Sequence, residues 1–150
     1  MKHEKILLIS KVILTLGALE FFGPILRDTN SSHLLNASWV GHARFHLMWN
    51  ICLWASMGVY SVYLLWFQKV FSVKDLYLCL IMQGMNAVAF WGSVALAGAY
   101  SGDVFDESIH VGVMNINENV LVFSVMSTLL LINYSIIKLG VEPSLKEVRA

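Results

Sequence analysis

Four long apolar runs dominate the sequence, from Ile6 to Leu26, Phe45 to Phe67, Leu76 to Tyr100 and Val120 to Leu139. A helix rises about 1.5 Å per residue, so about 20 apolar residues cross a hydrocarbon core of about 30 Å. Polar segments at 27–44, 68–75 and 101–119 separate the runs. The pattern predicts four transmembrane helices, at about residues 6–26, 39–67, 76–100 and 119–139.

A water-soluble helical bundle is the alternative that this pattern argues against. Such a bundle carries charged residues along one face of each helix, whereas the second and third runs contain no Asp, Glu, Lys or Arg. We therefore expect an all-α, four-helix integral membrane protein, with residues 1–150 as a single domain. The first run, preceded by Lys2 and Lys5, also has the form of a secretory signal peptide. Because it extends to Leu26, beyond the usual signal length, we expect it to remain as the first span.

Several residues predict where the helices bend, begin or end. Pro24 should kink the last turn of the first helix. Ser38 is the expected N-cap of the second helix, and Gly140 the expected C-cap of the fourth. The third helix is rich in small residues, including Gly98 and Gly102 at GxxxG spacing, which predicts close packing at the bundle centre.

Composition narrows the classes of function. The chain is 57% hydrophobic and 13% charged, against about 25% charged in soluble domains. Its formal net charge is zero, so it offers no basic surface for phosphates and we expect no nucleic-acid partner. The five Trp, five Tyr and eight Phe residues exclude a disordered chain, because disordered chains are poor in aromatics.

The basic residues predict an orientation in the membrane. Eight of the ten Lys and Arg residues lie at the two ends of the chain or in the second loop. The first and third loops carry only Arg27 and Arg44. Since basic residues are retained on the cytoplasmic side, we expect both termini in the cytoplasm and the two longer loops outside.

Histidines and carboxylates gather at the opposite face. Four of the five histidines and six of the ten acidic residues fall in the two outer loops or in the adjoining outer turns of the helices. They are Glu20, Asp28, His33, His42, His46, Asp103, Asp106, Glu107, His110 and Glu118. This segregation predicts a polar site on the non-cytoplasmic side.

Glu20 lies in the outer half of the first apolar run. An ionised carboxylate in hydrocarbon is costly, so we expect Glu20 either to pair with a cation or to keep its proton. A carboxyl group that exchanges a proton beside a pocket can act as an acid or a base, and we favour this catalytic interpretation. The alternative is structural, with Glu20 pairing with Arg27, Arg44 or a histidine to join helices.

His42 and His46 are four residues apart and share one face of the second helix, with Asn50 one turn further. The pair can supply two metal ligands, or His46 can work as an acid or base beside Glu20. A metal site needs further ligands, whereas a haem with two axial histidines needs its second histidine from across the bundle. Candidates for the further metal ligands are Glu20, Asp28, His33 and His110, and the second haem histidine would be His33 or His110. The alternative is that the histidines bond Glu20 and loop carbonyls.

Further side chains are expected to bind a ligand in the same pocket. They are His33, His42, Arg44, Asn50 and Asn86. Asn86 lies three residues after Gln83, so the two share a face of the third helix, where interhelical hydrogen bonding is the alternative role. Cys52 and Cys79 lie at opposite predicted depths, so we expect no disulfide between them.

A sequence pattern connects the first outer loop with the start of the second helix. It comprises Gly23-Pro24, Asp28-Thr29-Asn30, His33, Asn36, Trp39-Val40-Gly41-His42-Ala43-Arg44-Phe45-His46 and Trp49. Over about one third of the chain this resembles a family of small four-helix membrane proteins of unknown function, with Ala37 standing where that family has proline. The resemblance implies that His33, His42, Arg44 and His46 act together, and it implies no substrate.

These observations leave three functions open, and none identifies a cofactor. The first is a pocket for a small lipophilic ligand, sterol-like or quinone-like, on which Glu20 and His46 move protons, as in an isomerisation. The second is a metal- or haem-binding subunit of a membrane redox complex, with His42 and His46 as ligands. The third is a non-catalytic accessory subunit. Expected partners are the lipid bilayer, the ligand, and a membrane partner subunit or a second copy of the chain.

Overall fold

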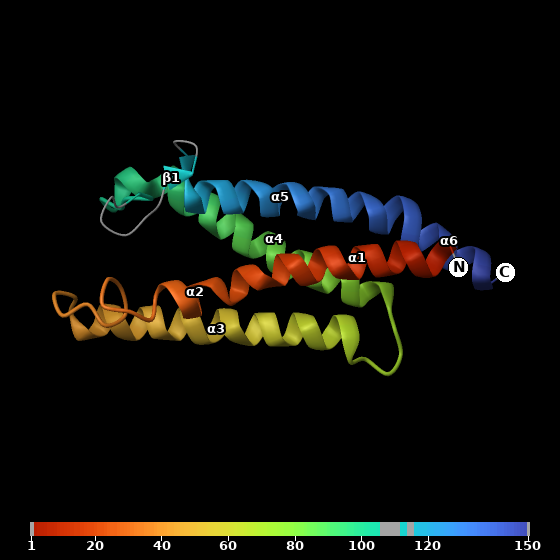
Figure 1. Cartoon of the computed structure of the whole chain (residues 1–150), viewed down its shortest axis with the longest axis horizontal. Helices are drawn as coiled ribbons and strands as arrows, with labels where there is room; N and C mark the ends of the chain where they lie inside the picture. The colour runs from red at the N-terminus through yellow and green to blue at the C-terminus, as the bar shows by residue number, and fades with distance from the viewer. Residues whose placement is uncertain (1, 106–111, 114–115, 150) are drawn as a thin grey trace.

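The structure of the chain, a computed structural model, describes residues 2–105, 112–113 and 116–149. Four long helical segments lie along one axis, as Figure 1 shows, so the expected all-α four-helix bundle is confirmed. The elements in chain order are α1 (Lys2–Ala18), η1 (Leu19–Phe21), α2 (Gly23–Arg27), α3 (Gly41–Trp66), α4 (Val73–Leu96), η2 (Ala97–Ala99), β1 (Gly112–Val113), β2 (Ile116–Asn117), α5 (Glu118–Ile136), η3 (Ile137–Val141) and α6 (Glu142–Arg149). The two short strands pair antiparallel before α5.

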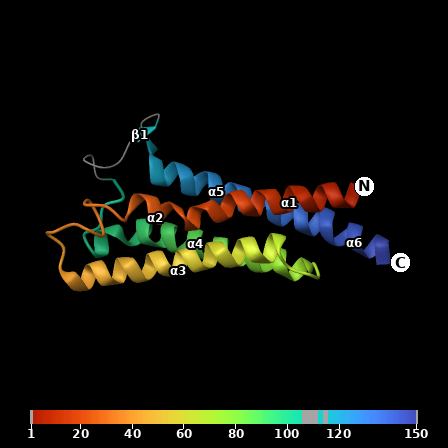
Figure 2. The ribbon, with the colours of Figure 1, turned by 60° about the horizontal axis from the view of Figure 1, so that its bottom comes forward.

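The bundle has two distinct ends. The start of α1 and the end of α6 lie together at one end, which we call the terminal end (Figures 1 and 2). Residues 28–40 and 100–105 lie at the other, which we call the loop end. Because α1 and α4 therefore run in the same direction and α3 and α5 run back, each depth in the bundle is shared by residues from all four segments.

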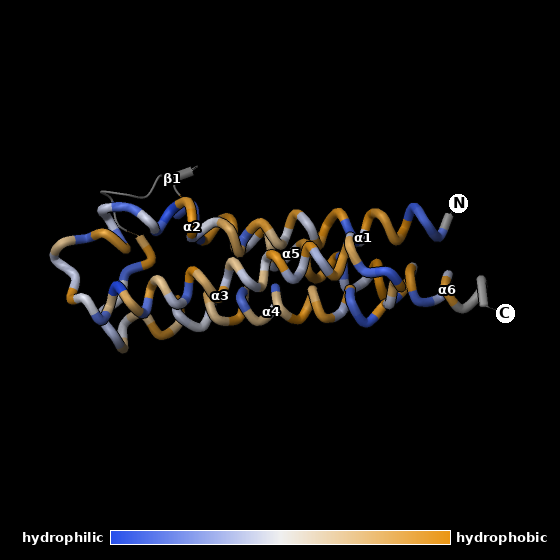
Figure 3. Tube along the Cα trace, turned by 90° about the horizontal axis from the view of Figure 1, so that it is seen from below, coloured by the Kyte–Doolittle hydropathy of each residue, from blue (hydrophilic) through white to orange (hydrophobic). Residues whose placement is uncertain are grey.

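Four segments are long and apolar enough to cross a membrane: His3–Arg27, Gly41–Trp66, Val73–Ala99 and Glu118–Leu145. In the apolar window of each segment, at most 28% of the residues are buried inside the protein. Large hydrophobic side chains therefore face outward along the helices, while hydrophilic residues concentrate at their ends and turns (Figure 3). Since a soluble protein rarely exposes such a surface, these features are those of a multi-pass integral membrane protein.

Pro24 interrupts the first span. The α-helix ends at Ala18, a 3₁₀ turn follows over Leu19–Phe21, and α2 begins at Gly23 with Pro24 in its first turn. Proline has no backbone N–H to donate to the carbonyl of residue 20, so the α-helical ladder cannot run through this point. The expected kink is confirmed, and it places Glu20 in the 3₁₀ turn.

The second span begins at Gly41 after Val40, which has no side-chain cap. The prediction that Ser38 caps this helix is wrong. Its hydroxyl instead donates to Asn36 Oδ1 at 2.7 Å, and its backbone N–H donates to the same oxygen at 2.9 Å. The Asn36 side chain thus closes a local turn, and the Ser38 hydroxyl that it binds is not free to cap the helix.

The third span begins three residues earlier than expected, at Val73. A capping box sets this start: Lys74 N–H donates to Ser72 Oγ at 3.2 Å, and Ser72 N–H donates to Asp75 Oδ2 at 3.2 Å. The two bonds satisfy backbone donors that the first turn of a helix leaves open.

The fourth span does not end at Gly140, so the predicted C-cap is wrong. The helix widens into a π-turn over Ile137–Val141 and continues as α6, with Pro143 in its first turn, where no backbone donor is needed. A Cβ on Gly140 would lie 2.9 Å from Ile6 Cγ2. The glycine therefore permits close approach of α1 rather than ending the helix.

The apolar core occupies the terminal half of the bundle. Its buried members are Leu14, Leu64, Leu65, Leu76, Cys79, Ile137 and Val141. The glycines of the third span do not contribute as expected, because Gly84, Gly92 and Gly98 have open space where a Cβ would stand. Both cysteines are free, Cys79 in the core and Cys52 exposed, which confirms that they do not pair.

Candidate functional site

Glu20 lies where the bundle divides. In the terminal half, α1 packs against α3, α4 and α5, whereas the main contacts of α2 are with α3 and η1. Toward the loop end, α2 and α3 diverge from α4 and α5, as Figure 1 shows. We call the point of divergence, at η1, the fork. The proline break thus positions an acidic side chain at the base of two separating helix pairs.

The carboxyl group of Glu20 is buried and has no hydrogen-bond partner in the part of the chain that the structure describes. Neither of its oxygens has measurable solvent exposure, and neither has a hydrogen-bond partner among the described residues. Asn86 of α4 lies near enough for its side chain to interact with the carboxyl, although the two form no hydrogen bond of good geometry. A buried acceptor with unmet hydrogen-bonding capacity is costly.

Among the described residues, four further polar side chains, those of Ser10, Ser61, Gln83 and Asn133, are buried inside the bundle. Gln83, on the face of α4 shared with Asn86, donates from Nε2 to the Leu14 carbonyl at 2.8 Å. This interhelical bond confirms one of the roles expected for that face. The side-chain oxygen of Gln83, Oε1, lacks a partner among the described residues. The same holds for buried polar atoms of Ser10, Ser61 and Asn133.

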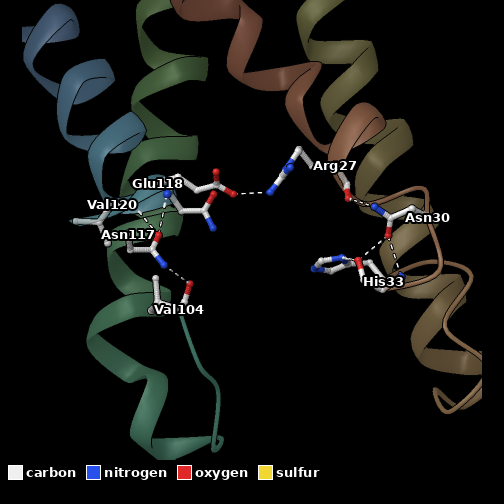
Figure 4. A network of polar contacts seen from close by, with 9 residues as sticks. Arg27, Asn30, His33, Val104, Asn117, Glu118 and Val120 are labelled. Atoms are coloured by element: carbon white, nitrogen blue, oxygen red, sulfur yellow. Dashed lines mark hydrogen bonds and ion pairs between the residues drawn. The ribbon is translucent and has the colours of Figure 1, made fainter. Parts of the chain in front are cut away.

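The ion pair between Glu20 and a basic residue, the structural alternative for this side chain, is not formed within the described part of the chain. Arg27 instead points across the fork to Glu118 of α5, with which it forms an ion pair and hydrogen bond (Figure 4). The Arg27 side chain is 58% exposed and the Glu118 side chain is 25% exposed. The pair bridges the two diverging halves near the loop end, which leaves Glu20 deeper in the fork.

His42 and His46 occupy an exposed face at the start of α3. Their Nε2 atoms are 3.0 Å apart, and the two rings meet edge to face. Asn50 donates from Nδ2 to the His46 carbonyl at 3.0 Å, and Arg44 is half-buried in the same turn. The spacing predicted that these side chains share a face, and they do, but that face is turned away from the bundle core.

The structure separates Glu20 from this histidine pair. A Cβ on Gly58 would lie 3.2 Å from Phe21 Cβ, so η1 lies at the depth of Gly58. His46 precedes Gly58 by twelve residues, which corresponds to about 18 Å along the helix axis. The expectation of one pocket containing Glu20, His42, His46 and Asn50 is therefore corrected, because the rotation of α3 directs its polar face outward. A proton transfer shared by Glu20 and His46 is not supported by this distance.

The remaining predicted residues lie in the loops. His33 accepts or donates through Nδ1 with the Ser32 hydroxyl at 2.8 Å and contacts the Trp39 ring edge to face. Within the described residues, no third His, Cys, Asp or Glu joins any pair to form a metal cluster. Asp103 is exposed, and Asp106, Glu107 and His110 lie outside the described residues.

Sequence analysis missed two features of this site. The Arg27–Glu118 bridge was not foreseen, because its partners are separated by 91 positions and no spacing links them. The buried positions of Ser10, Ser61 and Asn133 were also missed. The sequence marks each of them only as a polar residue within an apolar run. Whether such a residue faces the bundle core or the surroundings depends on how the helices pack.

Comparison with known proteins adds no relative to this picture: the chain matches no family model, no curated protein and no solved structure. Function is therefore inferred from the geometry of the fork.

Proposed function

We propose that this chain is an integral membrane protein that binds one small lipophilic molecule in the fork, with Glu20 and Asn86 recognising the polar group of the ligand. One observation carries the proposal: both oxygens of the Glu20 carboxyl are buried and lack a hydrogen-bond partner among the described residues. Polar groups inside a membrane bundle are costly and mark sites of function. A ligand that donates to Glu20 removes this cost.

The chemistry of the fork indicates the class of ligand. A carboxyl group accepts hydrogen bonds, and the Asn86 amide both donates and accepts, so together they suit a hydroxyl or amine on the ligand. The apolar side chains of the surrounding membrane helices suit a hydrocarbon body. We therefore favour a small amphiphile, such as a sterol-like or quinol-like molecule, that arrives from the bilayer rather than from water.

The orientation that we propose places the fork toward the non-cytoplasmic side. Its support is the segregation of eight basic residues to the terminal end and the turn before α4. In a chain whose two cysteines are replaced by serine, a cysteine at position 31 should react with an impermeant maleimide added outside, and one at position 69 only after permeabilisation. The opposite labelling pattern refutes the orientation.

Native mass spectrometry of the full chain in mild detergent tests the binding proposal. We expect the wild type to retain one small molecule and the Glu20→Gln variant to lose it, because the amide presents an N–H where the ligand presents its own donor. Glu142→Gln is the matched control, since Glu142 lies at the terminal end and accepts from Tyr77 and Lys138. Wild-type protein without bound mass, or equal retention by Glu20→Gln, contradicts the proposal.

A further inference from the structure

A pair of exposed histidines lies at the start of α3, well away from the fork. His42 and His46 direct their Nε2 atoms at each other at 3.0 Å, both side chains being exposed. A hydrogen bond between these atoms requires a proton on one Nε2 and a lone pair on the other. Moving that proton to Nδ1 leaves two neutral nitrogens with lone pairs that can converge on one ion, which is the state in which imidazole binds metals.

The distance between the nitrogens selects the geometry of the ion. With metal–nitrogen bonds of about 2.0–2.1 Å, two donors 3.0 Å apart subtend about 90–100° at the metal. This angle matches adjacent corners of a square-planar or tetragonal complex, the geometry of Cu²⁺ and Ni²⁺, better than the wider angle of a tetrahedral zinc site. Among divalent ions, Cu²⁺ binds nitrogen ligands most strongly.

The surroundings hold the rings in place. His46 stacks against the Trp49 ring with centroids 6.0 Å apart, and His42 stacks against Phe45 at 6.5 Å. Asn50 bonds the carbonyl of His46, which fixes the turn below. These contacts restrict the imidazoles before a metal arrives, so less rotamer entropy is lost on binding.

We propose that His42 and His46 form a two-histidine Cu²⁺ site on the membrane-surface end of α3, with water completing the coordination. Within the described residues no carboxylate or thiol joins the pair, so the remaining positions face solvent. Such an ion can exchange ligands or electrons with a partner molecule. The site does not rest on ligand binding in the fork, and either site can fail without the other.

Copper titration of the full chain in detergent tests this site. The protein is purified through a tag without histidine, and every variant carries His3→Ala, because a histidine third from a free amino terminus binds Cu²⁺ by itself. We expect one Cu²⁺ per chain, with nitrogen coupling from two imidazoles in the electron paramagnetic resonance spectrum. His42→Ala and His46→Ala should each weaken binding by about 100-fold or more, since loss of outer-shell partners alone costs about 10–100-fold.

Two variants serve as controls. His33→Ala should bind copper normally, because His33 Nδ1 is engaged by Ser32 and lies outside the pair. Exchanging His46 with Leu47 keeps the composition but rotates the imidazole by about 100° around the helix, and it should abolish the two-nitrogen signal. Unchanged copper binding in the His42→Ala, His46→Ala double variant overturns the proposal, and so does a wild-type spectrum without nitrogen coupling. Melting curves confirm that each variant is folded.

Discussion

Replacing Glu20 by leucine should stabilise the protein once the proposed ligand has been removed. Leucine has no polar side-chain atoms, so the variant escapes the cost of a buried carboxyl that has no partner among the described residues. The free energy of unfolding should rise by about 1–3 kcal/mol. The measurement is denaturant unfolding in detergent after the protein has been stripped of small molecules.

The matched control is Glu142→Leu, which removes a carboxylate that accepts from Tyr77 at 2.8 Å and Lys138 at 3.2 Å. This variant should lower stability, because it removes hydrogen bonds that are formed. The comparison also separates binding from the accessory-subunit alternative. If Glu20 served to hold helices together, Glu20→Leu would lower stability as Glu142→Leu does.

Replacing Gly58 by alanine should destabilise the fork and reduce ligand retention together. The added Cβ would lie 2.7 Å from two ring atoms of Phe22 and 3.2 Å from Phe21 Cβ. Phe21 is fully buried, so the Phe22 ring must shift and the 3₁₀ turn that carries Glu20 must give way slightly at Phe21. Overpacking of this kind costs about 1–3 kcal/mol, which the same unfolding titration measures.

Gly92→Ala on α4 is the matched control for this prediction. No atom lies within 4 Å of the position where its Cβ would stand, so only the helix preference of alanine acts. We expect stability to be unchanged or to rise by up to about 1 kcal/mol. Equal stability of Gly58→Ala and wild type would show that η1 does not depend on close contact with α3.

The four spans follow from the apolar runs because hydrocarbon thickness fixes helix length. Their ends are set by interactions that hydropathy does not report. Ser72 and Asp75 form a capping box that starts α4 earlier than the apolar run does. The Ser38 hydroxyl donates to Asn36 and therefore does not cap α3. Gly140 has the sequence features of a helix stop, yet the helix continues past it. A glycine is needed there because Ile6 of α1 approaches closely.

The candidate site was predictable only in part, for a geometric reason. A carboxylate in an apolar run identified Glu20, and helical spacing identified the shared faces of Gln83 with Asn86 and of His42 with His46. Spacing fixes angles within one helix but not the rotation of that helix about its own axis. In spans that are apolar all round, no charged face reports this rotation. The histidine face of α3 consequently points outward in the structure, away from Glu20.

The reactivity of Glu20 itself tests most directly whether a ligand binds at the fork. Dicyclohexylcarbodiimide is lipophilic and modifies carboxyl groups in apolar surroundings, and peptide mass spectrometry locates the product. In protein stripped of small molecules, Glu20 should be modified while Glu142, paired with Lys138, is not. In native membranes, the bound ligand should protect Glu20. A Glu20 that remains unmodified in the stripped protein, or that reacts equally in both states, would contradict a ligand site at the fork.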